Sequence, residues 1–302
     1  MTSRFYEIQI EIESNCYLKC LHCSSSSSAN TTTLLTKADI LRFLHIFNGA
    51  SHVYFTGGEP LLYPDLFSLC SQIQKEMPHI SMGLYTTGNL SNNMFISHNI
   101  AKKMKASGIC DCYFSIYSTH SSFHDRWTQT SGSMRHTVDS IKSIKEVGIS
   151  PKVHLVLTRD NILSISEVIS FCERLGVEEV RILKLIKAGR ASYNWDTIGL
   201  SEGEQNIAIE KVLRNKNDYK VKINVSGFPH LSPCRSFQDS AFCQAGINLL
   251  YIDHSGDVFP CACAKRFANS ARICNIKELG LMEKYIDAFN EIPFREKCLN
   301  EH

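Results

Sequence analysis

The sequence lacks the features that direct a chain to membranes, to secretion or to nucleic acids. The formal net charge of its 302 residues is only +2, so no strongly basic surface is expected. Acidic residues occupy the N-terminal segment where a signal peptide would have an apolar core. No apolar run approaches the roughly 20 residues of a membrane-spanning helix. We therefore expect a cytoplasmic protein with no nucleic-acid or membrane partner.

Cysteine, in contrast, is abundant, and the chain contains 13 of them. In a reducing compartment, cysteines serve as metal ligands or buried thiols more often than as disulfides. The 12 histidines are scattered, and no pair has the spacing of a metal site. With 43% apolar and 21% charged residues the chain is expected to fold around a packed core.

The first two-thirds of the chain alternates short apolar runs with segments of helical periodicity. Runs rich in Val, Ile, Tyr and Phe predict buried parallel strands at 7–12, 52–57, 80–87, 110–117, 152–158 and 179–186. Helical periodicity predicts helices at 36–47, 63–74, 92–108, 132–148 and 162–176. Strand–helix pairs with right-handed crossovers predict an α/β fold, a partial (β/α)6 TIM-like barrel, with chemistry at the C-terminal ends of its strands.

The pattern changes near residue 200. Residues 200–215 predict a further helix, 219–227 a further strand, and 249–259 a hairpin that turns at residues 254–256. Six cysteines follow from Cys234 onward. We expect a barrel domain at 1–225 and a small C-terminal α+β extension at 226–302.

Three cysteines lie close together just after the first predicted strand. Cys16, Cys20 and Cys23 are followed directly by the serine run 24–28. Three thiolates can hold three irons of a [4Fe–4S] cluster and leave the fourth iron open to an external ligand. A zinc ion with a remote fourth ligand, or thiols without a metal, are the alternatives that this spacing leaves open.

Together with a second motif, the triplet resembles the radical S-adenosylmethionine (radical SAM) enzymes. Gly57, Gly58, Glu59 and Pro60 follow the second predicted strand and are similar to the family's GGEP motif. The resemblance implies that the open iron binds the amino and carboxylate groups of S-adenosylmethionine, and that the GGEP motif binds its amino group. It also implies reductive cleavage to a 5′-deoxyadenosyl radical, which abstracts hydrogen from the substrate.

The same resemblance implies cofactor contacts at the ends of later strands. Thr87 and Asn89 lie in a segment similar to the family's TNG-like segment, and Ser115 stands where relatives place a ribose or carboxylate contact. Leu183 lies in the strand whose backbone meets the adenine. Arg190, in a GRA-type turn, is expected to reach the methionyl carboxylate or the substrate. An ordinary core serine and a surface ion pair are the plain alternatives for Ser115 and Arg190.

The cysteines of the tail resemble the twitch and SPASM extensions of this family, which bind auxiliary Fe–S clusters. The GDVFPC segment around Gly256 is close to their GxVxPC form, and its hairpin turn would bring Cys243 and Cys261 together. The tail is too short for two such clusters, so we expect one. The resemblance implies Cys234, Cys243 and Cys261 as ligands, with Cys298 as the fourth.

Cys263 and Cys274 remain as candidate catalytic residues. A thiol can donate a hydrogen atom to a substrate radical, as radical epimerases of this family do. Cys263 is the preferred candidate because it borders the predicted auxiliary cluster. A small buried hydrophobe or an alternative cluster ligand are the other interpretations of both.

These motifs predict a radical SAM enzyme, an oxidoreductase, isomerase or peptide maturase. The favoured substrate is a ribosomally made peptide that undergoes epimerisation, cross-linking or thioether formation. The alternative is a dehydrogenase or epimerase of a carbohydrate or aminoglycoside. A non-enzymatic Fe–S electron carrier is disfavoured, because it would have no use for GGEP or an open iron.

The two enzyme hypotheses predict different cavities. A peptide enzyme should have a wide, partly apolar cleft, whereas a sugar enzyme should have a smaller pocket rich in carboxylates. Either needs a low-potential electron donor such as a flavodoxin or ferredoxin. The chain starts directly with the first predicted strand, so no N-terminal leader-recognition domain is expected.

Overall fold

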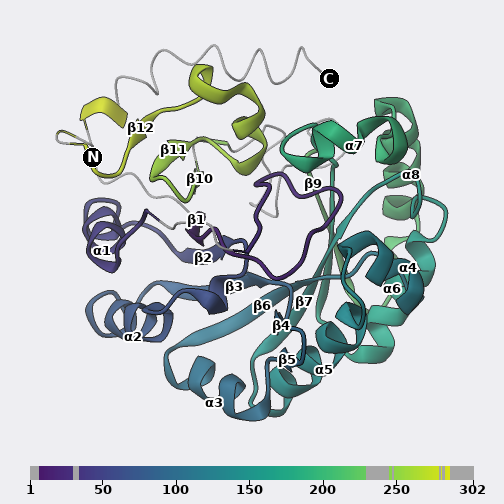
Figure 1. Ribbon diagram of the computed structural model, residues 1–302, viewed down its shortest axis with the longest axis horizontal. Helices are drawn as coiled ribbons and strands as arrows, with labels where there is room; N and C mark the ends of the chain where they lie inside the picture. Colours follow the sequence, from purple (N-terminus) through teal and green to yellow (C-terminus); the bar gives the residue numbers. More distant parts are fainter. Residues whose placement is uncertain are drawn as a thin grey trace.

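The structure is a computed structural model that describes residues 7–29, 34–228, 245–246, 248–278, 280 and 283–285. One curved sheet runs through these residues, with helices on its outer side (Figure 1). Its six central strands are parallel: β1 (Glu7–Glu13), β2 (His52–Gly57), β3 (Ser81–Thr86), β6 (Ile109–Ser115), β7 (Ser150–Val156) and β8 (Glu179–Leu183). The predicted partial (β/α)6 barrel is therefore confirmed.

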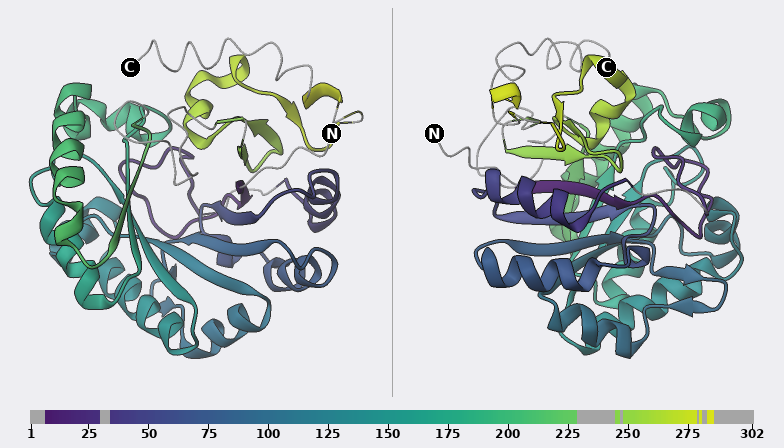
Figure 2. Two further views of the ribbon diagram at one scale, coloured as in Figure 1. Left: turned by 180° about the vertical axis from the view of Figure 1, so that it is seen from behind. Right: turned by 60° about the vertical axis from the view of Figure 1, so that its left-hand side comes forward.

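The outer helices follow the strands in the predicted order. They are α1 (Lys37–Ile46), α2 (Leu66–Glu76), α3 (His98–Ala106), α5 (Ser133–Glu146), α6 (Ile165–Leu175) and α8 (Glu202–Arg214), and Figure 2 shows them around the outside of the sheet. Thr36 caps α1 in a reciprocal capping box with Asp39. Gly176 ends α6 in the left-handed region.

Three short elements differ from the sequence prediction. Residues 92–97 were expected to begin a helix, but β4 (Asn89–Ser91) and β5 (Met94–Phe95) form a small hairpin there, and α3 starts only after its cap Ser97. Helices α4 (Ser121–Thr128) and α7 (Arg190–Ile198) occupy segments for which no helix was predicted. All of these elements lie at the C-terminal rim, where tertiary contacts outweigh local periodicity.

The sheet continues beyond the barrel on both sides. β9 (Lys222–Ser226) pairs with β8, and β10 (Leu249–Ile252) pairs in parallel with β1. β11 (Asp257–Phe259) and β12 (Cys274–Asn275) extend that second side as antiparallel strands. Within the described residues the sheet does not close, because β9 and β12 are its edges. The extension thus continues the barrel sheet, and a boundary near residue 225 stays a prediction.

The two faces of β1 show where the core and the cavity lie. Its alternate residues Ile8, Ile10 and Ile12 are fully buried and belong to the main apolar core, which also includes Phe43 of α1. The intervening polar side chains point to the inside of the arc. None of the helices in the described part of the chain is long and apolar enough to cross a membrane.

Candidate active site

A cavity of about 280 Å³ lies inside the arc of strands. It gathers predicted site residues from distant parts of the sequence. Its described lining includes Cys16, Cys20, Cys23, Gly57, Gly58, Thr87, Ser115, Leu183, Arg190 and Cys263. The parallel strands end around this cavity, as the barrel prediction required. The chain after β1, residues 14–29, crosses the middle of the arc (Figure 1) and is called the cluster loop below.

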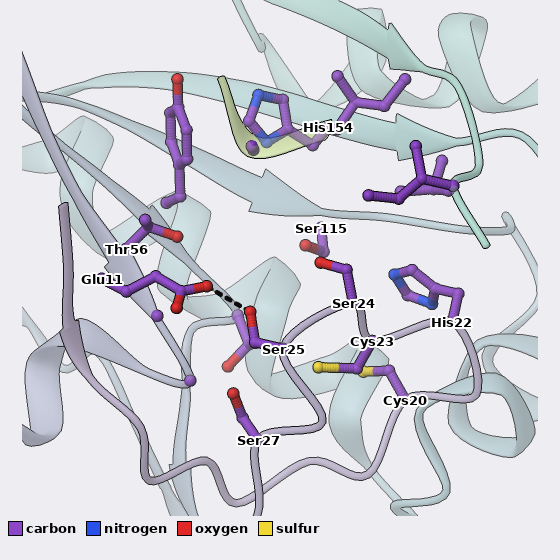
Figure 3. Close-up of a pocket in the computed structure, with 18 of the residues that line it drawn as sticks. Glu11, Cys20, His22, Cys23, Ser24, Ser25, Ser27, Thr56, Ser115 and His154 are labelled. Atoms are coloured by element: carbon purple, nitrogen blue, oxygen red, sulfur yellow. Dashed lines mark hydrogen bonds between the residues drawn. The ribbon is translucent and has the colours of Figure 1, made fainter. Parts of the chain in front are cut away.

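The three cysteines of the cluster loop lie together against the cavity. Cys16 and Cys20 are buried and Cys23 is half-buried (Figure 3 shows Cys20 and Cys23). Burial, reinforced by the neighbouring thiols, raises the pKa of Cys16 well above its usual range. Burial and the nearby Cys23 raise the pKa of Cys20 to about 12. Such thiols stay protonated unless a metal compensates the thiolate charge.

The three thiols of the triplet are a donor set that an Fe–S cluster can use. Among the described residues, no group of three His, Cys, Asp or Glu side chains converges on one ion position. In an Fe–S cluster each thiolate binds its own iron, so three cysteines lining one cavity satisfy the requirement.

Two glycines let strand β2 lie against the start of the cluster loop. A Cβ added at Gly57 would overlap the carbonyl oxygen of Glu13, and one at Gly58 would overlap that of Asn15. Gly57 also has a φ of +134°, which favours glycine. The Gly58 N–H donates to the Glu13 carbonyl at 2.7 Å. These glycines therefore serve the packing of the loop as well as lining the cavity.

Glu59 lies behind the cavity wall and is fully buried. Its carboxylate accepts hydrogen bonds from Thr86 Oγ1 at 2.7 Å, and from the N–H and Oγ1 of Thr87 at 2.8 and 2.7 Å. Burial raises the pKa of Glu59, although these hydrogen bonds oppose the shift. Both threonines line the cavity, whereas Glu59 and Pro60 are absent from its described lining. In this structure Glu59 positions the threonines.

Asn89, like Glu59, supports the cavity wall from behind. It is fully buried, outside the described lining of the cavity. Its side-chain amide donates to the carbonyl oxygens of Thr87 at 2.9 Å and Ser133 at 3.3 Å, and to Thr137 Oγ1 at 3.1 Å. It ties the end of β3 to α5 and holds Thr87, and its expected contact with the cofactor stays a prediction.

Arg190 faces the cavity, but its guanidinium is engaged with the cluster loop. Nε donates to the carbonyl oxygen of Cys20 at 2.8 Å, and Nη1 donates to that of Ser27 at 2.7 Å. Its backbone N–H donates to the Cys23 carbonyl at 2.9 Å. The preceding Gly189 has a φ of +55°, and a Cβ there would overlap the carbonyl oxygen of Ser24. The start of α7 thus clamps the loop.

Helix α4 supports the cluster loop, and this support was not predicted from the sequence. Trp127 Nε1–H donates to Nδ1 of His22 at 2.9 Å, and Tyr117 Oη lies 3.2 Å from Nε2. An indole nitrogen can only donate, so Nδ1 accepts and the ring proton lies on Nε2. Burial and the charge of Arg190 lower the pKa of His22 to about 3. The aromatic residues in the segment after β6 were the sequence signal for this contact.

The inner part of the cavity is aromatic and polar. Tyr85, Tyr113 and His154 line it, and the rings of Tyr113 and His154 stack with centroids 4.3 Å apart. Tyr113 Oη donates to Glu179 at 2.6 Å, and Tyr85 Oη donates to Glu7 at 2.9 Å. These carboxylates lie outside the described lining, so the surface offered to a ligand is ring and hydroxyl rather than charge.

The described cysteines of the tail lie in three different places, and the other three lie outside the described residues. Cys263 lines the cavity. Cys274, on β12, is 1% exposed and lies in the main apolar core, and Cys261 is half-buried against a small apolar cluster around Tyr251. Cys234, Cys243 and Cys298 lie outside the described residues. The auxiliary cluster therefore stays a prediction.

Two relatives and one solved structure show what the chain is similar to. It is 26% identical to an "AdoMet-dependent heme synthase" of Nitratidesulfovibrio vulgaris over 95% of this chain and 82% of the relative. It is 26% identical to "Mycofactocin maturase MftC" of Mycobacterium ulcerans over 83% of this chain and 66% of that protein. The structure of Streptococcus suis SuiB bound to precursor peptide SuiA superposes with a TM-score of 0.73 at 19% identity, covering 97% of this chain and 67% of SuiB.

A match to a family model is stronger evidence for the family of this chain than these similarities to single proteins. Residues 10–172, more than half of the chain, match the model of the Radical SAM superfamily. The match covers the cysteine triplet, the GGEP motif and the strands from β2 to β7. The family binds a [4Fe–4S] cluster and S-adenosylmethionine, and the thiol-lined cavity fits both. The chain belongs to the radical SAM superfamily.

Proposed function

We propose that this chain reductively cleaves S-adenosylmethionine and abstracts hydrogen from a C–H bond of a ribosomally made peptide. The observation that carries the radical step is the single cavity lined by the cysteine triplet, by Gly57 and Gly58, and by Thr87. When bound, the [4Fe–4S] cluster and S-adenosylmethionine supply a 5′-deoxyadenosyl radical. The chain holds these groups, orients the substrate and excludes water.

The cavity wall suggests how the chain divides these tasks. Cys16, Cys20 and Cys23 hold three irons of the cluster. Small and hydroxyl-bearing residues nearby leave room for S-adenosylmethionine and offer it hydrogen bonds: Gly57, Gly58, Thr86, Thr87 and Ser115. Leu183 lines the part of the wall that we assign to the adenine. Arg190 acts by fixing the cluster loop rather than by gripping the carboxylate.

The character of the wall supports a peptide substrate. Glu11 is the one carboxylate in the described lining, and Lys265 neutralises it. The rest of the described lining mixes aromatic and aliphatic side chains such as Tyr85 and Leu185 with uncharged polar ones and with the cations Lys184 and Arg190. A carbohydrate or aminoglycoside enzyme was expected to have a carboxylate-rich pocket. The similarities to MftC and to SuiB with its precursor peptide also support a peptide, whereas the heme synthase likeness favours a small molecule.

The extension completes the proposal. We assign one auxiliary Fe–S cluster to residues 226–302, with Cys234, Cys243, Cys261 and Cys298 as ligands. Cys263 faces the cavity and is our candidate for the thiol that donates hydrogen, whereas Cys274 lies in the core without a place on the described wall. A flavodoxin- or ferredoxin-like donor would supply the electron. The abundance of reduced thiols favours the cytoplasm.

Anaerobic reconstitution tests the radical step. Protein reduced with dithionite should convert S-adenosylmethionine to 5′-deoxyadenosine, and Cys20→Ala should abolish this conversion. Co-expression with any small peptide that the neighbouring genes are found to encode, followed by mass spectrometry, tests the substrate. An unmodified peptide together with turnover of a small molecule would overturn the peptide hypothesis, and absence of 5′-deoxyadenosine would overturn the enzyme hypothesis.

A further inference from the structure

A buried charged group at the cavity wall has no role in the reaction proposed above. Glu11, on β1, lines the cavity and is only 3% exposed. Its carboxylate accepts a hydrogen bond from Lys265 Nζ at 2.7 Å and one from Ser25 Oγ, which Figure 3 shows. His254 Nδ1 lies 3.5 Å from the other carboxylate oxygen. A buried carboxylate is stable as an anion only with such partners.

Lys265 supplies the compensating positive charge from the C-terminal extension. It lies in the 3₁₀ segment η3 (Ala262–Ser270), and its side chain is 13% exposed. Besides Glu11, its Nζ donates to Ser25 Oγ at 2.8 Å and to Tyr251 Oη at 2.9 Å. An ammonium has three N–H bonds, so these three contacts use all of them. The flexible lysine side chain is thereby fixed in one position.

The protonation state of Glu11 agrees with this geometry. Burial acts to raise its pKa, but the charge of Lys265 and hydrogen bonds from His254, Lys265 and Ser25 hold the pKa well below its usual range. Glu11 and Lys265 therefore form an ion pair near neutral pH. The cavity beside them experiences no net charge from the pair.

The ion pair joins the two cysteine-bearing segments of the chain. Ser25 follows the last cysteine of the triplet, Cys23, by two positions in the serine run. Lys265 follows Cys263, which lines the cavity, by two positions. One ammonium thus links β1, the cluster loop, β10 and η3. The serine run, which the proposed function leaves unexplained, provides the hydroxyl in the middle of this link.

We propose that Lys265 is a positioning residue that ties the extension to the cluster loop and cancels the negative charge of Glu11 beside the S-adenosylmethionine-binding cluster. This inference rests on the proposed function, because it concerns a cluster that must accept an electron. Without Lys265, Glu11 keeps only Ser25 and His254 as partners, and at a pH high enough to keep it ionised it would leave an uncompensated negative charge at the cavity wall. A negative charge opposes the addition of an electron, so the cluster would become harder to reduce.

The experiment compares charge variants of the full-length, anaerobically reconstituted protein. The cluster is followed in a redox titration by the electron paramagnetic resonance signal that changes when S-adenosylmethionine is added. At a fixed solution potential and at alkaline pH, where the Glu11 carboxylate of the variant is ionised, Lys265→Met should lower the ratio of reduced to oxidised cluster about tenfold, equivalent to a potential lowered by about 59 mV for a one-electron couple. Glu11→Gln should raise that ratio instead, because it removes the negative charge of Glu11 and leaves the positive charge of Lys265 uncompensated.

The double variant Lys265→Met/Glu11→Gln separates charge from mere structure. This variant lacks both charges, so the reduction potential of its cluster should be close to that in the unmodified protein. A purely structural effect would move both single variants in the same direction and would not be rescued in the double variant. Either result, or a Lys265→Met variant with an unchanged potential, would overturn the inference.

Lys277→Met is the matched control. Lys277 lies in the same extension and also reaches the barrel side, where its Nζ donates to the carbonyl oxygen of Leu34. It is absent from the described cavity lining, so the potential should stay unchanged. A shift equal to that of Lys265→Met would count against a specific role for Lys265. Failure of the unmodified protein to cleave S-adenosylmethionine would instead overturn the proposed function, so the two failures are distinguishable.

Discussion

The two sides of the cluster loop are held by different kinds of contact. On the barrel side, close packing at Gly58, hydrogen bonds from Arg190 to loop carbonyls, and the contact between Trp127 and His22 hold the loop. On the extension side, Ser25 of the loop bonds to the ion pair between Glu11 and Lys265. The barrel side depends on close packing and on several separate hydrogen bonds. The extension side depends on one charge, so a single substitution can change the electrostatics of the cavity there.

The largest effect is expected at Gly58, where the backbone after β2 lies against the backbone of the cluster loop. Gly58→Ala places a Cβ against the carbonyl oxygen of Asn15 and should push the cluster loop away from β2. We expect a free energy of unfolding lowered by about 3 kcal/mol, as for an overpacked site, together with loss of most cluster iron. Iron analysis and thermal unfolding measure both effects.

Gly203→Ala is the control for this substitution. Gly203 lies in α8, and an added Cβ there would meet no atom within 4 Å. This variant should keep the iron content and stability of the unmodified protein. If Gly58→Ala also keeps them, close packing of the loop is not what holds the cluster site.

A smaller effect is expected from replacing Arg190, whose guanidinium donates to carbonyl oxygens of the cluster loop. Arg190→Met removes the donors to the carbonyl oxygens of Cys20 and Ser27 but keeps the backbone contact. The free energy of unfolding should fall by about 2 kcal/mol, because the charged donors are lost, and a chelator should remove iron faster. Arg214→Met, at an exposed ion pair with Glu210, should change neither. Equal rates of iron loss in the two variants would refute the clamp.

The smallest effect concerns pH and the support behind α4. His124 is a buried residue of the loop-supporting helix α4, and burial lowers its pKa from 6.5 to about 4. Between these values the unfolded chain binds a proton that the folded chain excludes, so stability should rise with pH through this window and be lost as pH falls. His124→Asn should flatten this dependence in pH-resolved unfolding.

Much of the barrel could be predicted because its strands are locally encoded. The runs beginning near Glu7, His52 and Glu179 are bounded by polar residues, and their apolar side chains must be buried on the outer face. The rim was predicted less well. The hairpin at Asn89 and helix α7 at Arg190 depend on contacts with segments far away in the sequence. Local periodicity carries no information about such contacts.

In the candidate site, likewise, the motifs predicted which residues lie near the cysteines but not what each residue contacts. The sequence indicated that Gly58, Glu59 and Arg190 belong together near the cysteines. It did not indicate that Glu59 would point at the threonines behind the wall, or that Arg190 would bind loop carbonyls. Lys265 carried no motif at all, because its importance comes from reaching Glu11 across the sheet.

The sequence by itself determined the chemistry available to this protein. The spacing of Cys16, Cys20 and Cys23, with the GGEP motif, already indicated a cluster with an open iron, because together they resemble the radical SAM family, whereas the triplet alone left zinc or free thiols open. The tertiary structure decided which residues face the cavity and which support it. The physical reason is that burial, hydrogen bonding and charge compensation depend on distances between segments, such as Glu11 and Lys265, that lie far apart in the chain.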